Sequence, residues 1–316
     1  MNHSSIDSAN KQGFAFAIGA ALLFSCKPII IKWAYGYGID ALSLMLLRMM
    51  LALPVYLFIG SVLIQKQKLL QQKDRLPFKH WLGAAFVGLL GYYLASFLDL
   101  KGLELANAQL ERIILYAYPT LVVILGAIIF KHKVSKQQMA ALALCYAGII
   151  CIFLQDLSLQ GEQVIHGSLL ILLSALSYAI YMLFSKKHID RLGSLLFTCI
   201  SMASATFATI IHTGLVLTLS PLGRTGFNSN NWEFSGELIA IVLLLTFAAT
   251  VVPSFMISEA VKRIGAANAA LTGTVGPIMT SIMAVVLLGE VFTIYHGLGM
   301  VLVILGVSRL KPRQKK

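Results

Sequence analysis

Four charged side chains stand inside long apolar runs of the sequence: Lys27, Arg48, Glu111 and Arg112. A lone charge in the core of a bilayer costs several kcal/mol, so such residues usually pair with one another or line a binding path. Counted along the expected helices at about 1.5 Å per residue, all four lie at a similar depth. We therefore expect a Lys27–Glu111 ion pair with both arginines beside it. Such a group would attract a carboxylate or phosphate, while Glu111 would bind an amine or a proton.

A simpler interpretation assigns these charges to structure alone. Arg48 would then fasten neighbouring helices, and Glu111 and Arg112 would extend to the lipid headgroups, as long side chains near helix ends do. His212 and His296 are further titratable groups near the ends of apolar runs. Histidine titrates near neutral pH, so protons are a candidate coupling ion.

A stripe of polar residues marks one face of the apolar run at 167–184. Ser177, Tyr178 and Tyr181 belong to it, together with Ser174 and Ser185, at the spacing of neighbours on one helix face. In a membrane such a face prefers the interior of the bundle or a watery cavity. The alternative is that each hydroxyl bonds a carbonyl of its own helix or joins two helices, without touching a ligand.

Other polar residues recur 158 positions apart in related runs. The matched residues are Tyr92 with Thr250, Ser96 with Ser254, Tyr116 with Thr274, and Pro119 with Pro277. Proline removes one backbone hydrogen bond and frees a carbonyl, so both prolines are expected to break a helix and open polar backbone toward a cavity. We take the hydroxyl residues as candidates for substrate binding and the prolines as candidates for gating.

The elements that must hold these residues are ten apolar runs. The chain has 316 residues, of which 58% are apolar and 12% charged, and its mean hydropathy of +0.82 excludes an ordinary soluble domain. A helix needs about 20 apolar residues to cross a bilayer core of about 30 Å. We place the runs at 13–33, 41–64, 81–98, 108–130, 139–154, 167–184, 192–219, 238–257, 266–288 and 291–307. The sequence predicts an all-α integral membrane protein of ten transmembrane helices.

The basic residues predict an orientation. The formal net charge is +12, yet the bases fall between apolar runs rather than in one stretch that could bind nucleic acid. With an inner N-terminus, 19 of the 25 Lys and Arg residues lie in inner segments and three in outer ones. Positive residues favour the cytoplasmic side, so we expect a multi-pass protein of the cell inner membrane with both termini in the cytoplasm.

The chain also resembles itself. At an offset of 158, Ser96 falls on Ser254 and Pro119 on Pro277, and at an offset of 154, Gly13 falls on Gly167. The first, third, fourth and fifth runs thereby match the sixth, eighth, ninth and tenth. Each half has five spans, and an odd number means that the halves cross the membrane in opposite senses. We divide the chain into an N-terminal segment 1–12, a repeat 13–154, an outer linker 155–166, a repeat 167–309 and a basic tail 310–316.

These features carry a resemblance to a known family. The stretch 13–32, the residues Leu47–Arg48 followed by Ala52-Leu53-Pro54, the two proline-containing spans and the closing Leu288-Gly289-Glu290 resemble the EamA-type branch of the drug/metabolite transporter superfamily. The resemblance implies an efflux carrier or exchanger of amino acids or other metabolites. We expect Glu290 to cap the start of the tenth span, where a carboxylate meets the positive end of a helix.

The function expected from these observations is secondary transport, in efflux or exchange, of a small metabolite or drug-like molecule by alternating access between two inverted repeats. Amino acids and other zwitterionic or anionic compounds are the candidate substrates. A passive facilitator or channel is the alternative, because sequence does not show whether one side closes when the other opens. An intramembrane enzyme is disfavoured, since the chain has no H-E-x-x-H, G-x-S-x-G or P-loop motif. No cofactor, metal or nucleic acid is expected, and the protein would act as a monomer or homodimer in the bilayer.

Overall fold

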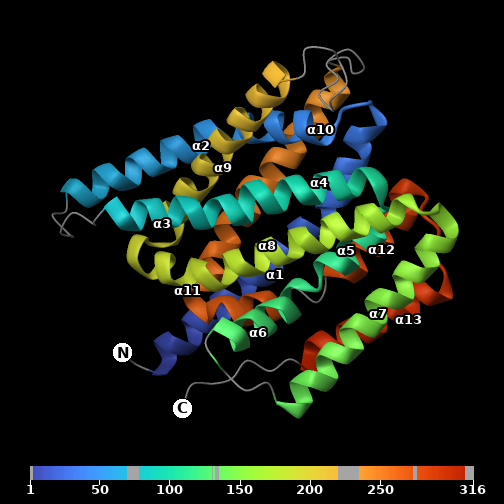
Figure 1. Ribbon diagram of the computed structural model, residues 1–316. Coiled ribbons are helices and arrows are strands. Elements are labelled where there is room, and N and C mark those ends of the chain that lie inside the picture. Colours follow the sequence, from blue (N-terminus) through green and yellow to red (C-terminus); the bar gives the residue numbers. More distant parts are fainter. Residues whose placement is uncertain are drawn as a thin grey trace.

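A computed structural model describes residues 3–69, 78–129, 131, 135–219, 235–272 and 276–309 (Figure 1). Every regular element within these ranges is a helix. Eight helical segments are long and apolar enough to cross a membrane, and two shorter apolar helices, Gly276–Leu288 and Ile294–Arg309, complete the ten expected spans. The prediction of an all-α integral membrane fold built from two repeats is confirmed.

The first half runs from α1 to α7. Its helices are α1 (His3–Gly36), α2 (Ala41–Leu69), α3 (Phe78–Gly88), the π-helix η1 (Leu89–Leu94), α4 (Ala95–Leu105), α5 (Ala108–Leu115), α6 (Tyr118–Ile129) and α7 (Lys136–Gln160). The elements α3, η1 and α4 follow one another without a break and make a single span, Phe78–Leu105. This span ends seven residues later than the apolar run that predicted it, at Leu105 instead of Leu98.

The second half repeats this order. It contains α8 (Gln163–Leu192), α9 (Ser194–Leu219), α10 (Gly236–Thr246), the π-helix η2 (Phe247–Val251), α11 (Val252–Thr272), α12 (Gly276–Leu288) and α13 (Ile294–Arg309). Gly265 has φ 80° and bends α11, at the position that matches the α4–α5 turn in the first half. A residue with a β-carbon rarely adopts this backbone conformation, which explains the glycine.

The two π-helices are the clearest structural sign of the repeat. η1 begins at Leu89 and η2 at Phe247, which are 158 residues apart. A π-turn holds one residue more than an α-turn does, and such turns are rare and often found at functional sites. Tyr92 of η1 and Thr250 of η2 occupy matching positions, and both line the same cavity.

Contacts between the halves follow the same symmetry. α1 packs along α11, and α8, the counterpart of α1, packs along α4. α7 pairs with its own counterpart α13, and Figure 1 shows these two helices side by side at the lower right. α2 packs in the same way against α9. The first and second halves therefore interlock, and the space between them is lined from both.

Candidate functional site

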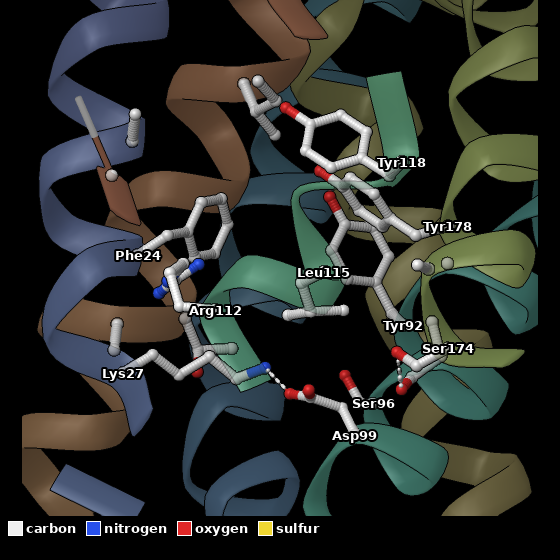
Figure 2. Close-up of a pocket in the computed structure, with 18 of the residues that line it drawn as sticks. Phe24, Lys27, Tyr92, Ser96, Asp99, Arg112, Leu115, Tyr118, Ser174 and Tyr178 are labelled. Atoms are coloured by element: carbon white, nitrogen blue, oxygen red, sulfur yellow. Dashed lines mark hydrogen bonds and ion pairs between the residues drawn. The ribbon is translucent and has the colours of Figure 1, made fainter. Parts of the chain in front are cut away.

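A cavity of about 130 Å³ lies between the two halves. By the same measure one water molecule needs about 10–15 Å³, so the cavity has room for a small organic solute. Figure 2 shows its wall: Lys27 and Asp99 lie at one end, and Tyr92, Tyr118 and Tyr178 stand together at the other. The cavity is thus charged at one end and aromatic at the other.

The ion pair at the charged end joins Lys27 of α1 to Asp99 of α4. Lys27 Nζ donates to Asp99 Oδ2 at 2.5 Å, and the two side chains are 14% and 2% exposed. The expected Lys27–Glu111 pair is therefore wrong. The apolar run in the sequence ends at Leu98, one residue before Asp99, whereas the helix continues to Leu105 and keeps Asp99 in the wall of the cavity.

Glu111 lies behind the wall instead of in it. The side chain is completely buried by protein, which contradicts the simpler expectation that it reaches the lipid headgroups. Its carboxyl group lies within hydrogen-bonding reach of the Asp99 carboxyl group. Glu111 thus contacts the charged cluster at Asp99. The members of the cluster that line the cavity are Lys27, Arg48, Asp99 and Arg112.

Two arginines complete the charged end. Arg48 of α2 is 2% exposed and Arg112 of α5 is 9% exposed, and both line the cavity. Arg112 Nε donates to Thr280 Oγ1 at 3.1 Å, and Thr280 Oγ1 donates to the Ser25 carbonyl at 2.9 Å, so the second half holds this guanidinium in place. Within the part of the chain that the structure describes, Arg48 Nε and Nη2 and Arg112 Nη2 have no hydrogen-bond partner.

The aromatic end is a cluster of tyrosine rings. Tyr92 and Tyr181 share a hydroxyl–hydroxyl hydrogen bond of 2.9 Å, and the Tyr178 ring lies 5.3 Å from Tyr118 and 5.4 Å from Tyr181 between centroids. Tyr92, Tyr118 and Tyr178 face the cavity, whereas Tyr181 is buried behind them. Tyr118 was not predicted, although it lies next to Pro119, where a broken helix should expose its neighbours.

The hydroxyl candidates divide into two groups. Ser96, Tyr116 and Thr250 line the cavity. Ser177 instead donates to the Leu90 carbonyl at 2.7 Å, and Ser254 donates to the Val251 carbonyl at 2.7 Å. Neither of these two serines lines the cavity in the described chain. Ser177 joins two helices and Ser254 bonds a carbonyl of its own helix, as the structural interpretation expects. Thr274 lies outside the described residues.

Both predicted prolines lie at the second residue of a helix. α5 ends at Leu115 and α6 begins at Tyr118, with Pro119 as its second residue. Pro277 is likewise the second residue of α12. In the first turn of a helix, the backbone N–H that proline lacks would have no acceptor within the helix. Proline therefore favours the start of a helix at this position. Pro28 was missed: it follows Lys27 inside α1 and leaves the Phe24 carbonyl without its usual helical donor.

Glu290 has a different role from the one expected. Its carboxylate accepts hydrogen bonds from the backbone amides of Ala108 and Gln109, at 2.7 and 3.1 Å. These amides open α5, so Glu290 caps a helix of the first half and not the start of α13. The carboxylate meets the positive end of a helix dipole, as expected, but across the interface between the halves.

Comparison with known proteins identifies this architecture. The model of the EamA-like transporter family matches residues 11–154 and again 165–310, once for each half. The chain belongs to the EamA-like transporter family. It is similar to the transporter YcbK of Bacillus subtilis (strain 168), with 28% identity over 88% of this chain and 86% of that protein.

Two further matches cover nearly the whole transporter. A probable amino-acid metabolite efflux pump of Salmonella typhimurium (strain LT2) is 23% identical over 95% of this chain and 94% of its own length. A solved crystal structure superposes with a TM-score of 0.61 and 18% identity over 96% of each chain, which supports the fold alone. The protein is thus a multi-pass membrane transporter with a small-molecule substrate.

Proposed function

We propose that this transporter is a secondary carrier of a small amphipathic organic anion or zwitterion, which it moves by alternating access between its inverted halves, in efflux or exchange. The observation that carries the proposal is the pair of buried guanidinium groups facing the cavity. Arg48 Nε and Nη2 and Arg112 Nη2 have no acceptor among the described residues. Buried donors without partners are costly, and a carboxylate is the acceptor whose geometry suits an arginine best.

The tyrosines support the amphipathic part of the proposal. Tyr92, Tyr118 and Tyr178 form an aromatic wall opposite the charged cluster. Aromatic side chains bury large apolar surface and favour ring contacts, so this end suits the apolar body of a substrate whose carboxylate is held by the arginines. An efflux pump for amino-acid metabolites among the relatives fits a substrate of this class.

A panel of small carboxylates and amino acids tests the proposal. Purified transporter is screened for ligands that raise its unfolding temperature, and the compounds that bind are then tested for uptake into proteoliposomes. We expect aromatic or branched carboxylates to bind, and Arg48→Gln to abolish their effect. Lys262→Gln is the matched control, because Lys262 is an exposed cation outside the cavity lining. Equal binding by Arg48→Gln would contradict the proposal.

Counterflow separates a carrier from a passive facilitator. Proteoliposomes loaded with unlabelled substrate should take up labelled substrate faster than empty ones, because a carrier returns faster when it is loaded. A facilitator would show no acceleration.

The orientation is also part of the proposal: the cell inner membrane, with both termini in the cytoplasm. The Lys and Arg asymmetry between the segments supports it. Fusion of a reporter that is active only in the cytoplasm to each terminus should give signal at both ends. Signal at one end alone would exclude an even number of spans.

A further inference from the structure

Two acidic side chains lie against each other beside the cavity, and the binding of an anion by arginine does not use them. Glu111 and Asp99 are 0% and 1% exposed, and their carboxyl groups lie within hydrogen-bonding reach of each other. Lys27 donates to Asp99 Oδ2 at 2.5 Å. Among the described residues, Asp99 Oδ1 and both oxygens of Glu111 receive no donor.

Two ionised carboxylates in this arrangement would have a high free energy. A buried anion without donors lacks the hydrogen bonds that water would give it, and two like charges in contact repel each other. A single proton removes both difficulties: a protonated Glu111 donates its O–H to Asp99 Oδ1. Lys27 donates to Asp99, whereas neither oxygen of Glu111 receives a donor, so the proton belongs on Glu111.

We propose that Asp99 and Glu111 form a proton-binding pair, with the proton on Glu111, and that binding of the organic anion in the cavity depends on this proton. The inference deepens the proposed function and rests on it for the identity of the anion. The proton-binding pair itself rests on Asp99, Glu111 and Lys27 alone.

The groups that face Glu111 favour this assignment. Lys27 and Lys32 of α1 and Arg112 of α5 interact with it electrostatically, as does Asp99 of α4. On the other helices packed against α5, the α12 segment 276–288 contains no titratable side chain. Asp156 of α7 is engaged by Asn107 and His296, and His166 of α8 is exposed. Within the described chain, Lys27 is bound to Asp99 and Arg112 to Thr280, and neither donates to Glu111.

The proton changes what the cavity attracts. Lys27, Arg48 and Arg112 oppose Asp99 and Glu111, so loss of the Glu111 charge leaves three cations against one anion instead of two. A more positive cluster binds an organic anion more tightly, and by linkage the bound anion strengthens the hold on the proton. Glu111 does not line the cavity, so it acts through charge without contacting the anion. Binding of the anion is therefore accompanied by uptake of the proton.

Infrared spectroscopy of the purified wild-type transporter tests the pair without any substrate. We expect the carbonyl band of a protonated carboxylic acid at neutral pH, shifted in heavy water and lost in Glu111→Gln. The glutamine keeps an N–H donor for Asp99, so the variant should fold. Asp190→Asn, at an exposed acid, should keep the band. A wild-type spectrum with no such band at neutral pH overturns the pair, as does a band that persists unchanged in Glu111→Gln.

Calorimetry with benzoate tests the coupling. Benzoate affinity of the wild type should fall with rising pH, by up to about tenfold per pH unit once the proton is released, and titrations in buffers of different ionisation enthalpy should show net proton uptake. Glu111→Gln should bind benzoate with an affinity that pH does not change. Equal pH dependence in both proteins overturns the coupling. If benzoate binds at no pH, the anion-binding function and the coupling both fail, while the infrared band alone decides the proton-binding pair.

Discussion

The two halves of the transporter place the same backbone around the cavity and line it with different chemistry. η1 and η2 begin 158 residues apart, and α1–α11 packing mirrors α8–α4 packing. Yet each charged residue of the described cavity wall belongs to the first half. At the matching positions, Lys27 corresponds to Tyr181, Asp99 to Ile257, Glu111 to Ala269 and Arg112 to Ala270.

Because of this difference, a symmetric backbone encloses a cavity with an asymmetric charge distribution. A repeat with charges in both halves would bind two anionic ends equally well. The first half supplies the charged side chains together with Tyr92 and Tyr118, whereas the second half adds uncharged surface such as Ile257 and Tyr178. An amphipathic substrate can therefore bind in one orientation, with its charged end toward α1, α2 and α5.

The largest effect should come from removing the counter-ion of Lys27. Asp99→Ala leaves a buried ammonium without its partner, and breaking such a pair typically costs about 3–5 kcal/mol of unfolding free energy. Reversible denaturation in detergent measures this loss. The double variant Lys27→Met/Asp99→Leu should recover much of it, since two apolar side chains replace the pair. If the double variant were as unstable as Asp99→Ala, the charge would not be the cause.

Arg112→Gln should weaken binding of every carboxylate, with or without a ring. A hydrogen bond to a charged group contributes about 1.5–3 kcal/mol, so the affinities for acetate and benzoate should both fall by that amount in calorimetric titrations. Lys262→Gln serves again as the control. Loss of benzoate binding with unchanged acetate binding would show that the first half does not act through charge.

Gly91→Ala tests the packing of the aromatic end. A β-carbon on Gly91 would lie 2.4 Å from the Tyr181 ring, and such overpacking costs about 1–3 kcal/mol. The matching residue in the second half is already alanine, Ala249. Ala249→Gly should cost about 1 kcal/mol through helix propensity alone. Thermal unfolding of both variants makes the comparison, and a stable Gly91→Ala protein would show that Tyr181 can move aside.

The smallest effect is expected at the second-half wall. Tyr178→Ala should lower benzoate affinity by about 0.5–1.5 kcal/mol, the value of a favourable ring contact, and leave acetate affinity unchanged. Tyr178→Phe is the matched control and should retain benzoate binding. Equal losses of acetate and benzoate affinity would contradict the proposal that Tyr178 contacts the apolar part of the substrate.

Composition and internal similarity were enough to predict the ten spans and the repeat, because the bilayer imposes length and apolarity on every crossing helix. The positions of Lys27, Arg48 and Arg112 in the cavity followed from the cost of burying charge. That cost did not indicate which acid pairs with Lys27. Asp99 lies just beyond the expected run 81–98, since hydropathy alone does not distinguish an acid beyond a helix end from one neutralised inside the helix.

The repeat contained the missing signal. An offset of 158 places Asp99 on Ile257, which belongs to the expected span 238–257, so the matching position should also lie within the membrane. The π-turns were not predictable in this way, because they depend on the packing of neighbouring helices and leave no periodic trace in the sequence. Hydroxyl residues were the hardest to assign: Ser96 and Ser177 look alike in sequence, and their surroundings alone separate them.

Glu290 has a mechanical consequence for how the halves can move. Its carboxylate joins the loop after α12 to the first turn of α5 through two charge-assisted hydrogen bonds. Parting the halves at this point would break both bonds and leave the first amides of α5 uncapped. Movement elsewhere between the halves does not carry this penalty. A relative rotation of the halves about that end of the bundle would keep both hydrogen bonds of Glu290, whereas a separation there would lose them.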